Sequence, residues 1–85
     1  MDVINGFLNH LKSRGYAANT IRTYKSALAP FTDRDLNLIT AADMMIILSR
    51  YNDPAAATSR LSAFNTFFKW AVEQGLAKNN PAERV

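Results

Sequence analysis

Apolar residues recur along this chain every three or four positions, which is the period of one face of an α-helix. No segment shows the sustained alternation of apolar and polar residues that is typical of a half-buried β-strand. The pattern therefore predicts an all-α fold, a four-helix bundle. The expected helices span residues 2–14, 19–30, 41–51 and 54–74.

The ends of these helices are marked by residues that start or stop helices. Thr40 and Asp43 stand three positions apart before an apolar run, which is the spacing of a capping box. Pro54 occupies the first position of the last helix, where its missing N–H costs nothing. The first and last helices both stop at a glycine, Gly15 and Gly75, with an apolar residue after it.

The apolar faces predict one small hydrophobic core, with Phe64 and Phe68 at its centre. A chain of 85 residues is near the lower limit for a fold without disulfides or metal ions. Each large side chain that is buried contributes roughly 1.5–3 kcal/mol. The predicted core consists of Phe7, Leu8, Leu11, Ile21, Tyr24, Leu28, Ile46, Ile47, Leu61, Phe64, Phe67 and Phe68.

The composition excludes most kinds of catalytic and metal chemistry. The chain has no cysteine and one histidine, His10, so it offers neither a disulfide framework nor the ligands of a typical zinc site. Its acids are scattered, and it contains no glycine-rich phosphate loop. We therefore expect no catalytic residue, no metal and no cofactor. Without a signal peptide or a long apolar span, the chain is expected to be a soluble domain of the cytoplasm.

Charge is distributed unevenly, although the net charge is only +3. No acid occurs between Asp2 and Asp33, whereas the stretch from Asp33 through Asp53 contains four acids, counting both ends. The stretch from Pro54 to Val72 again has only bases. This layout predicts one basic face, although an ordinary solvated surface explains the charges equally well when they are taken alone. The bases of the two acid-free stretches are Lys12, Arg14, Arg22, Lys25, Arg60 and Lys69.

The outward sides of the second and fourth helices combine bases with small hydroxyl residues. If Ile21, Tyr24 and Leu28 face inward, the residues between them face outward. Bases neutralise phosphates, and short side chains let a helix approach base edges in the major groove. The candidate DNA-binding residues are Thr20, Arg22, Thr23, Lys25 and Ser26 on the second helix, and Ser59, Arg60, Ser62, Ala63 and Thr66 on the fourth.

Three segments of the chain, taken in order, resemble the N-terminal core-binding, SAM-like domain of phage integrases, the tyrosine recombinases. They are "FLNHLKSRGYAANTIRTYKSALAPF", "LITAADM" and "ATSRLSAFNTFFKWAVEQGLAKNNPAERV". In that family a glycine ends the first helix, a "TI..Y" helix follows, a threonine caps the third, and the last closes with "G-x-x-x-x-NP". The matching positions here are Gly15, Thr20, Ile21, Tyr24, Thr40, Gly75, Asn80 and Pro81.

The resemblance implies half of a clamp on duplex DNA, with the second and fourth helices at the major groove. The implied partners are double-stranded DNA, a C-terminal catalytic domain of the same chain, and other recombinase protomers on DNA. On this interpretation residues 1–79 form the DNA-binding domain, and residues 80–85 begin the linker to a catalytic domain. The nucleophilic tyrosine, arginines and histidine of the family belong to that second domain and are absent here.

Two other functions are compatible with the same helices. The chain is alternatively a helical protein–protein interaction module without DNA binding. What distinguishes the two is whether the outer faces of the second and fourth helices merge into one basic surface. A small helix-turn-helix regulator is disfavoured, because about nine residues connect the second and third helices, where that motif has a turn of three or four.

Overall fold

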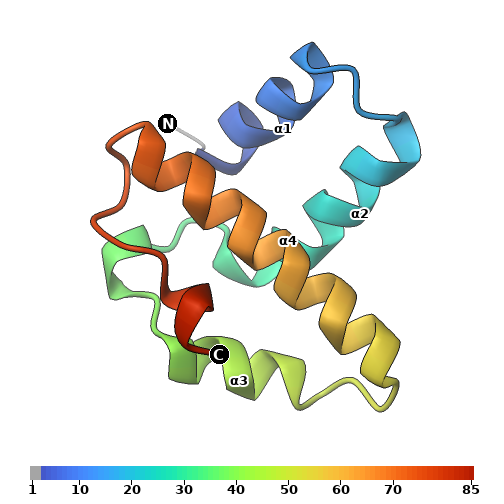
Figure 1. The fold of residues 1–85 in the computed structure, drawn as a ribbon, viewed down its shortest axis with the longest axis vertical. Helices are drawn as coiled ribbons and strands as arrows, with labels where there is room; N and C mark the ends of the chain where they lie inside the picture. The colour runs from blue at the N-terminus through green and yellow to red at the C-terminus, as the bar shows by residue number, and fades with distance from the viewer. Residues whose placement is uncertain (1–2) are drawn as a thin grey trace.

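Four α-helices account for most of residues 3–85, which are the residues that the computed structural model describes (Figure 1). No strand occurs among them, so the prediction of an all-α fold is confirmed. Asp2, the expected first residue of the first helix, lies outside the described residues. The helices are α1 (Val3–Ser13), α2 (Ala18–Leu28), α3 (Ala41–Leu48) and α4 (Pro54–Glu73), and the 3₁₀ turns are η1 (Ala29–Phe31), η2 (Leu36–Leu38) and η3 (Pro81–Arg84).

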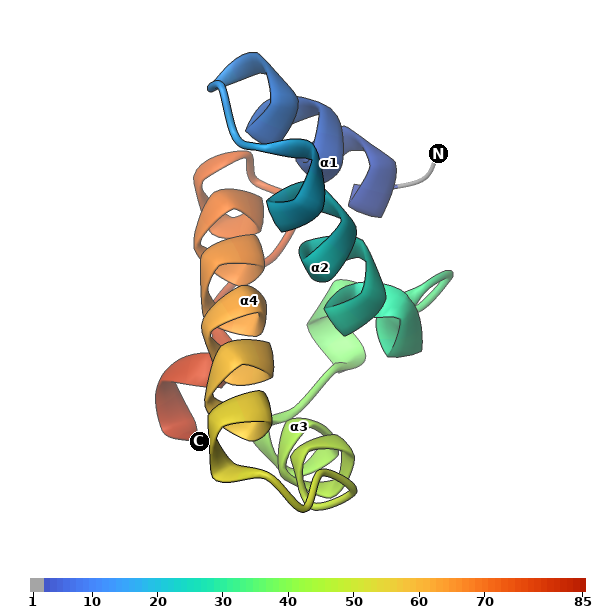
Figure 2. The ribbon, with the colours of Figure 1, turned by 90° about the vertical axis from the view of Figure 1, so that its right-hand side faces the viewer.

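The longest helix, α4, contacts each of the other three α-helices. Figures 1 and 2 show α1 and α2 beside its C-terminal and central turns, and α3 beside its first turns. The final turn, η3, packs against both α3 and α4. As a result α4 has one face toward the core, a neighbouring face under η3, and a third face toward solvent.

Two helices are shorter than the sequence predicts. The prediction that the third helix reaches residue 51 is wrong, because α3 ends at Leu48. The amides of Arg50 and Tyr51 donate to the carbonyls three residues earlier, as in a 3₁₀ turn. The Ser49 hydroxyl also donates to the carbonyl of Ile46, at 2.7 Å. The second helix ends at Leu28 and continues as η1 through Pro30, whose ring nitrogen has no hydrogen to donate. This tighter turn carries Phe31 into the core, where it is 1% exposed.

The core is a set of aromatic rings in edge-to-face contact. Phe31 meets Phe64 with 4.9 Å between ring centroids, and Phe67 contacts both Phe7 and Phe68 at 5.2 Å. Such arrangements place the positive edge of one ring against the negative face of the next. Phe64 and Phe68 have no exposed surface, so their predicted place at the centre of the core is confirmed.

One predicted core residue is in fact a surface residue. Ile46 is 58% exposed, and Met44, two positions earlier, is fully buried in its place. The helix α3 is apolar nearly all the way round, so the period of its residues did not indicate which face is inside. Four other predicted core residues are only half-buried against the core: Ile21, Tyr24, Ile47 and Leu61.

The predicted helix signals are present as hydrogen bonds. The Asp43 amide donates to the Thr40 hydroxyl at 3.1 Å, and the Thr40 amide donates to the Asp43 carboxylate at 2.9 Å, which completes the capping box. The second bond stabilises the charged carboxylate and holds the pKa of Asp43 below its usual value. Gly15 and Gly75 end α1 and α4 at φ of 83° and 74°, where a side chain would be strained.

The segment from Asn80 to Arg84 is packed onto the helices. The side chain of Asn80 accepts a hydrogen bond from the Ala82 amide at 3.0 Å and donates one to the Asn65 carboxamide of α4 at 2.7 Å. Pro81 and Ala82 are both buried. The expectation that residues 80–85 begin an interdomain linker stays a prediction, since packing against α4 does not reveal what the segment leads to.

Candidate nucleic-acid interface

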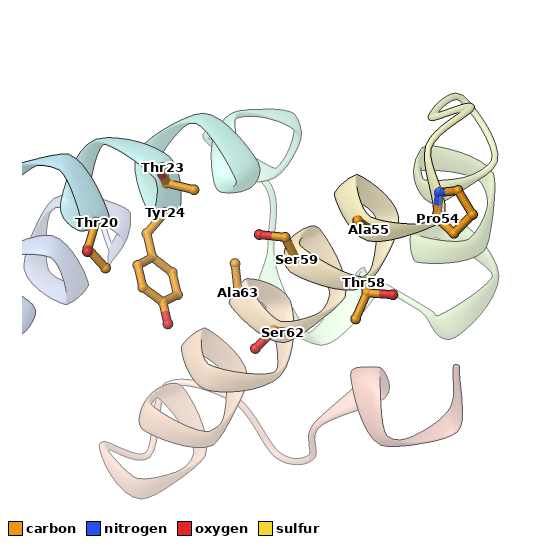
Figure 3. Close-up of a pocket in the computed structure, with 9 residues that line it drawn as sticks. All are labelled: Thr20, Thr23, Tyr24, Pro54, Ala55, Thr58, Ser59, Ser62 and Ala63. Carbon is orange, nitrogen blue, oxygen red and sulfur yellow. The ribbon is translucent and has the colours of Figure 1, made fainter.

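A groove of about 690 Å³ runs between α2 and the first half of α4 (Figure 3). One wall comes from the outer side of α2 and the other from turns of α4 that do not face the core. Most of the lining side chains carry a hydroxyl group, and none carries a charge. The lining residues are Thr20, Thr23, Tyr24, Pro54, Ala55, Thr58, Ser59, Ser62 and Ala63.

The groove follows from the helical period of α4. Phe64, Phe67 and Phe68 fix which side of the helix faces the core. Ser62 is about 160° around the helix from Phe64, because successive residues turn by about 100°. A line of exposed residues, with the half-buried Thr66 among them, therefore runs along α4, and we call it the outer stripe: Thr58, Ser59, Ser62, Thr66 and Lys69.

The structure brings together part of the set of candidate DNA-binding residues. Thr20 and Thr23 of α2 face Ser59 and Ser62 of α4 across the groove. The remaining candidates on α2 are exposed but do not line the groove: Arg22, Lys25 and Ser26. The two bases lie about 100° or more around α2 from Thr23, on positions suited to phosphates beside the groove.

Three candidates on α4 are less exposed than predicted: Arg60 and Thr66 are half-buried, and Ala63 is buried. Arg60 is half-buried, with its guanidinium 5.3 Å from the ring centroid of Tyr51 and its Nε donating to the Tyr51 hydroxyl at 3.3 Å. It comes four residues before Phe64 and so shares the core-facing side of α4. Ala63 is 3% exposed, because it lies one turn before the buried Phe67, and it lines the groove from that position.

A second cleft, of about 420 Å³, lies between the end of α1 and the second half of α4. Thr66, half-buried, lines this cleft and not the groove. The cleft is also lined by His10, by the two cations Arg14 and Lys69, and by the carboxylate-bearing Glu73. We call this the basic cleft. It shares α4 with the hydroxyl-lined groove, and the two follow one another along the outer stripe without a lining residue in common.

The basic cleft was not among the sequence-based candidates. Lys69 could have been found, because it follows Thr66 by three residues and Ser62 by seven, on the same side of a helix. Arg14 could not, because its place beside α4 depends on how α1 packs. Among residues 3–85, none of the bases Arg14, Arg22, Lys25 and Lys69 forms an ion pair within 4.0 Å, so their charges are available to a ligand.

The described part of the chain gathers no group of three His, Asp or Glu residues that could hold a metal ion. Within residues 3–85, no helix has the length and hydrophobicity needed to cross a membrane. The surface built by α2, α4 and the end of α1 combines hydroxyls, methyl groups and cations, with the carboxylate of Glu73 beside Lys69. That combination suits an extended polyanion with apolar features, as duplex DNA has.

Comparison with known families identifies the class of domain. Residues 4–75 match the family described as "Phage integrase, N-terminal SAM-like domain". The chain belongs to this family, and the resemblance seen in the sequence is confirmed.

Two curated relatives share this sequence pattern. Both are proteins named "Tyrosine recombinase XerC", one from a strain of Bifidobacterium longum and one from Bifidobacterium longum subsp. infantis. Each is 37% identical to this chain over an alignment of 90 positions, and the alignment covers 93% of this chain. The chain spans only 25% of the length of these relatives. No solved structure gives a significant match.

Proposed function

We propose that this chain is the DNA-binding, core-binding domain of a tyrosine recombinase, which clamps duplex DNA at a recombination site through α2 and α4. The observation that carries this proposal is the surface along the outer stripe, where the hydroxyl-lined groove and the basic cleft follow one another in a member of the integrase family. The alternative is a protein-interaction module. The outer sides of α2 and α4 meet in one groove, but no cation lines it, so the merged basic surface that would distinguish the two functions is not present in the groove itself.

The dimensions of α4 support this proposal. The outer stripe from Thr58 to Lys69 is about 16 Å long, at 1.5 Å per residue. The major groove of B-DNA is about 12 Å wide and admits a helix. A helix lying there would have phosphates on both sides, within reach of Arg22 and Lys25 on α2 and of Lys69 at the end of the stripe.

The wider organisation is proposed from the family and the relatives. Residues 1–79 are proposed to form the DNA-binding domain, and residues 80–85, which pack against it as η3, to lead toward a catalytic domain that carries out strand cleavage and joining. That domain and other recombinase protomers on DNA are the proposed partners, and the cytoplasm is the proposed location. The share of the relatives' length that this chain spans, 25%, is consistent with one domain of several.

Lys69→Ala and Arg22→Ala are each expected to weaken the salt dependence of DNA binding. Every phosphate neutralised releases a counterion, so losing one contact flattens the slope of log K against log salt by about one unit. Fluorescence anisotropy with a short duplex between about 50 and 200 mM salt measures the slope. Arg50→Ala is the matched control, since Arg50 is an exposed base beyond the end of α3, away from both clefts.

A slope that stays the same in the Lys69→Ala, Arg22→Ala double variant would contradict this interface. Equal flattening by Arg50→Ala would indicate diffuse attraction without a defined face. NMR titration locates the contacts independently, and shifts concentrated on residues 33–51 would favour the protein-interaction alternative.

The isolated chain is expected neither to cut nor to rejoin DNA. A nucleophile needs an adjacent base and groups that stabilise the transition-state charge. Among the described residues, Tyr51 is the tyrosine whose hydroxyl has a cationic partner, Arg60, and that side chain lies half-buried against the tyrosine ring. Incubation with supercoiled plasmid, followed by gel electrophoresis, tests this prediction. Relaxation that disappears in a Tyr51→Phe variant would reveal an active site in this chain.

A further inference from the structure

The groove between α2 and α4 lacks the side chains that usually distinguish bases. Guanine is read by Arg or Lys, adenine by Asn or Gln, and cytosine by Asp or Glu. None of these six residue types lines the groove. Hydroxyl groups bond to any base, so they discriminate weakly. The groove therefore offers little selectivity through hydrogen bonds.

What the groove does offer is methyl groups. Three threonines, Thr20, Thr23 and Thr58, line it together with the alanines Ala55 and Ala63. Figure 3 shows these side chains on both walls, with Thr23 on the α2 wall and Ala63 below Ser59 on the α4 wall. In the major groove the C5-methyl of thymine is the one apolar feature that a base pair presents, and it packs against Ala or the methyl of Thr.

Thr23 provides an independent observation in favour of methyl contact. Its hydroxyl donates to the carbonyl of Asn19 within α2 at 3.0 Å. That bond uses the only proton of the hydroxyl, so the side chain cannot donate to a base without breaking it. Thr23 lines the groove all the same, where it presents its methyl and the acceptor lone pairs of its hydroxyl.

A phosphate is a poor occupant of this groove, because no cation lines it. The cations stand outside it, on α2 and in the basic cleft. The cations around the groove are thus placed to bind phosphates, and the methyl groups inside it are placed for apolar contact with bases.

We propose that the groove recognises the C5-methyl group of thymine, so that this domain prefers duplex sites with thymines facing α2 and α4. The proposal rests on the proposed DNA-binding function and names what that surface reads. Selectivity comes from how many methyl groups are buried, so the preference is for A·T pairs as a class.

The test compares two duplexes of the same A·T-rich sequence, one with thymine and one with deoxyuridine, which lacks only the methyl group. Anisotropy titration is expected to give about fourfold weaker binding for each buried methyl that is lost, which corresponds to about 0.8 kcal/mol per carbon. A G·C duplex with 5-methylcytosine, which places a methyl at the equivalent ring position, is expected to bind more tightly than the same duplex with cytosine.

A matched pair of variants assigns the effect to the protein. Thr23→Ser keeps the hydroxyl and removes the methyl, so the ratio of thymine to deoxyuridine affinity is expected to fall. Thr23→Val keeps a methyl and removes the hydroxyl, so the ratio is expected to persist. Thr23 is exposed, and neither change removes buried surface. A preference that arose from DNA stiffness alone would be the same in both variants and would overturn the proposal.

Equal affinity for the thymine and deoxyuridine duplexes, with the salt dependence intact, would overturn methyl recognition and leave the DNA-binding function standing. Failure to bind either duplex at low salt would overturn both.

Discussion

Phe68→Ala is expected to destabilise the domain by about 3–5 kcal/mol. Phe68 has no exposed surface and lies in the aromatic cluster, 5.2 Å from Phe67 and 6.3 Å from Phe31 between ring centroids. Removing a buried phenylalanine ring costs about 3–5 kcal/mol, through lost burial and the cavity left behind. A domain of this size has about 4–13 kcal/mol of stability, at 0.05–0.15 kcal/mol per residue. The loss therefore consumes a large part of the total.

Urea denaturation followed by circular dichroism measures this loss. The matched control is Val72→Ala, four residues later on α4, where the side chain is 37% exposed and the change is expected to cost less than about 1 kcal/mol. Similar midpoints for the two variants would show that the aromatic cluster does not hold the fold together in the way proposed.

Removing residues 80–85 is expected to destabilise the domain by about 2–4 kcal/mol. Pro81 and Ala82 are buried, and each contributes on the order of 1 kcal/mol through burial. The Asn80 side chain adds its bond to Asn65 and its bond to the Ala82 amide, at about 1 kcal/mol each. The prediction concerns the domain boundary directly, because a chain ending at residue 79 would lack this packing.

Asn80→Ala separates the two contributions. It removes both side-chain hydrogen bonds and keeps Pro81 and Ala82, so it is expected to cost about half as much as the deletion. Thermal unfolding of the three proteins gives the comparison. If the shortened chain melted at the same temperature as the full one, residues 80–85 would be peripheral to the fold, and the boundary at residue 79 would hold.

The helices were predictable because their signals are local. The capping box at Thr40 and Asp43, and the glycines that stop α1 and α4, depend on neighbours in the sequence. The inward side of α3 was not predictable, because Met44 and Ile46 are equally apolar and only the packing of α3 against α4 decides between them. Leu36, which is buried in the 3₁₀ turn η2, was absent from the predicted core because such a turn lies outside the helical period.

The candidate site was predictable in outline and not in detail. The hydroxyl residues of α2 and α4 were expected to face outward, and Thr20, Thr23, Ser59 and Ser62 do line one groove. Arg60 was assigned to the outside because it lies between apolar positions, although its four-residue spacing from Phe64 places it toward the inner side, where the aromatic ring of Tyr51 accommodates it.

The chain contains a single tryptophan, Trp70, and its position makes its intrinsic fluorescence a useful signal. The indole is half-buried, with its centroid 5.5 Å from that of Phe7 in the core and 6.0 Å from that of His10 in the basic cleft. Its emission is therefore sensitive both to loss of the core and to occupation of the cleft. Tryptophan fluorescence of the unlabelled protein can therefore follow both unfolding and the binding of DNA at the basic cleft.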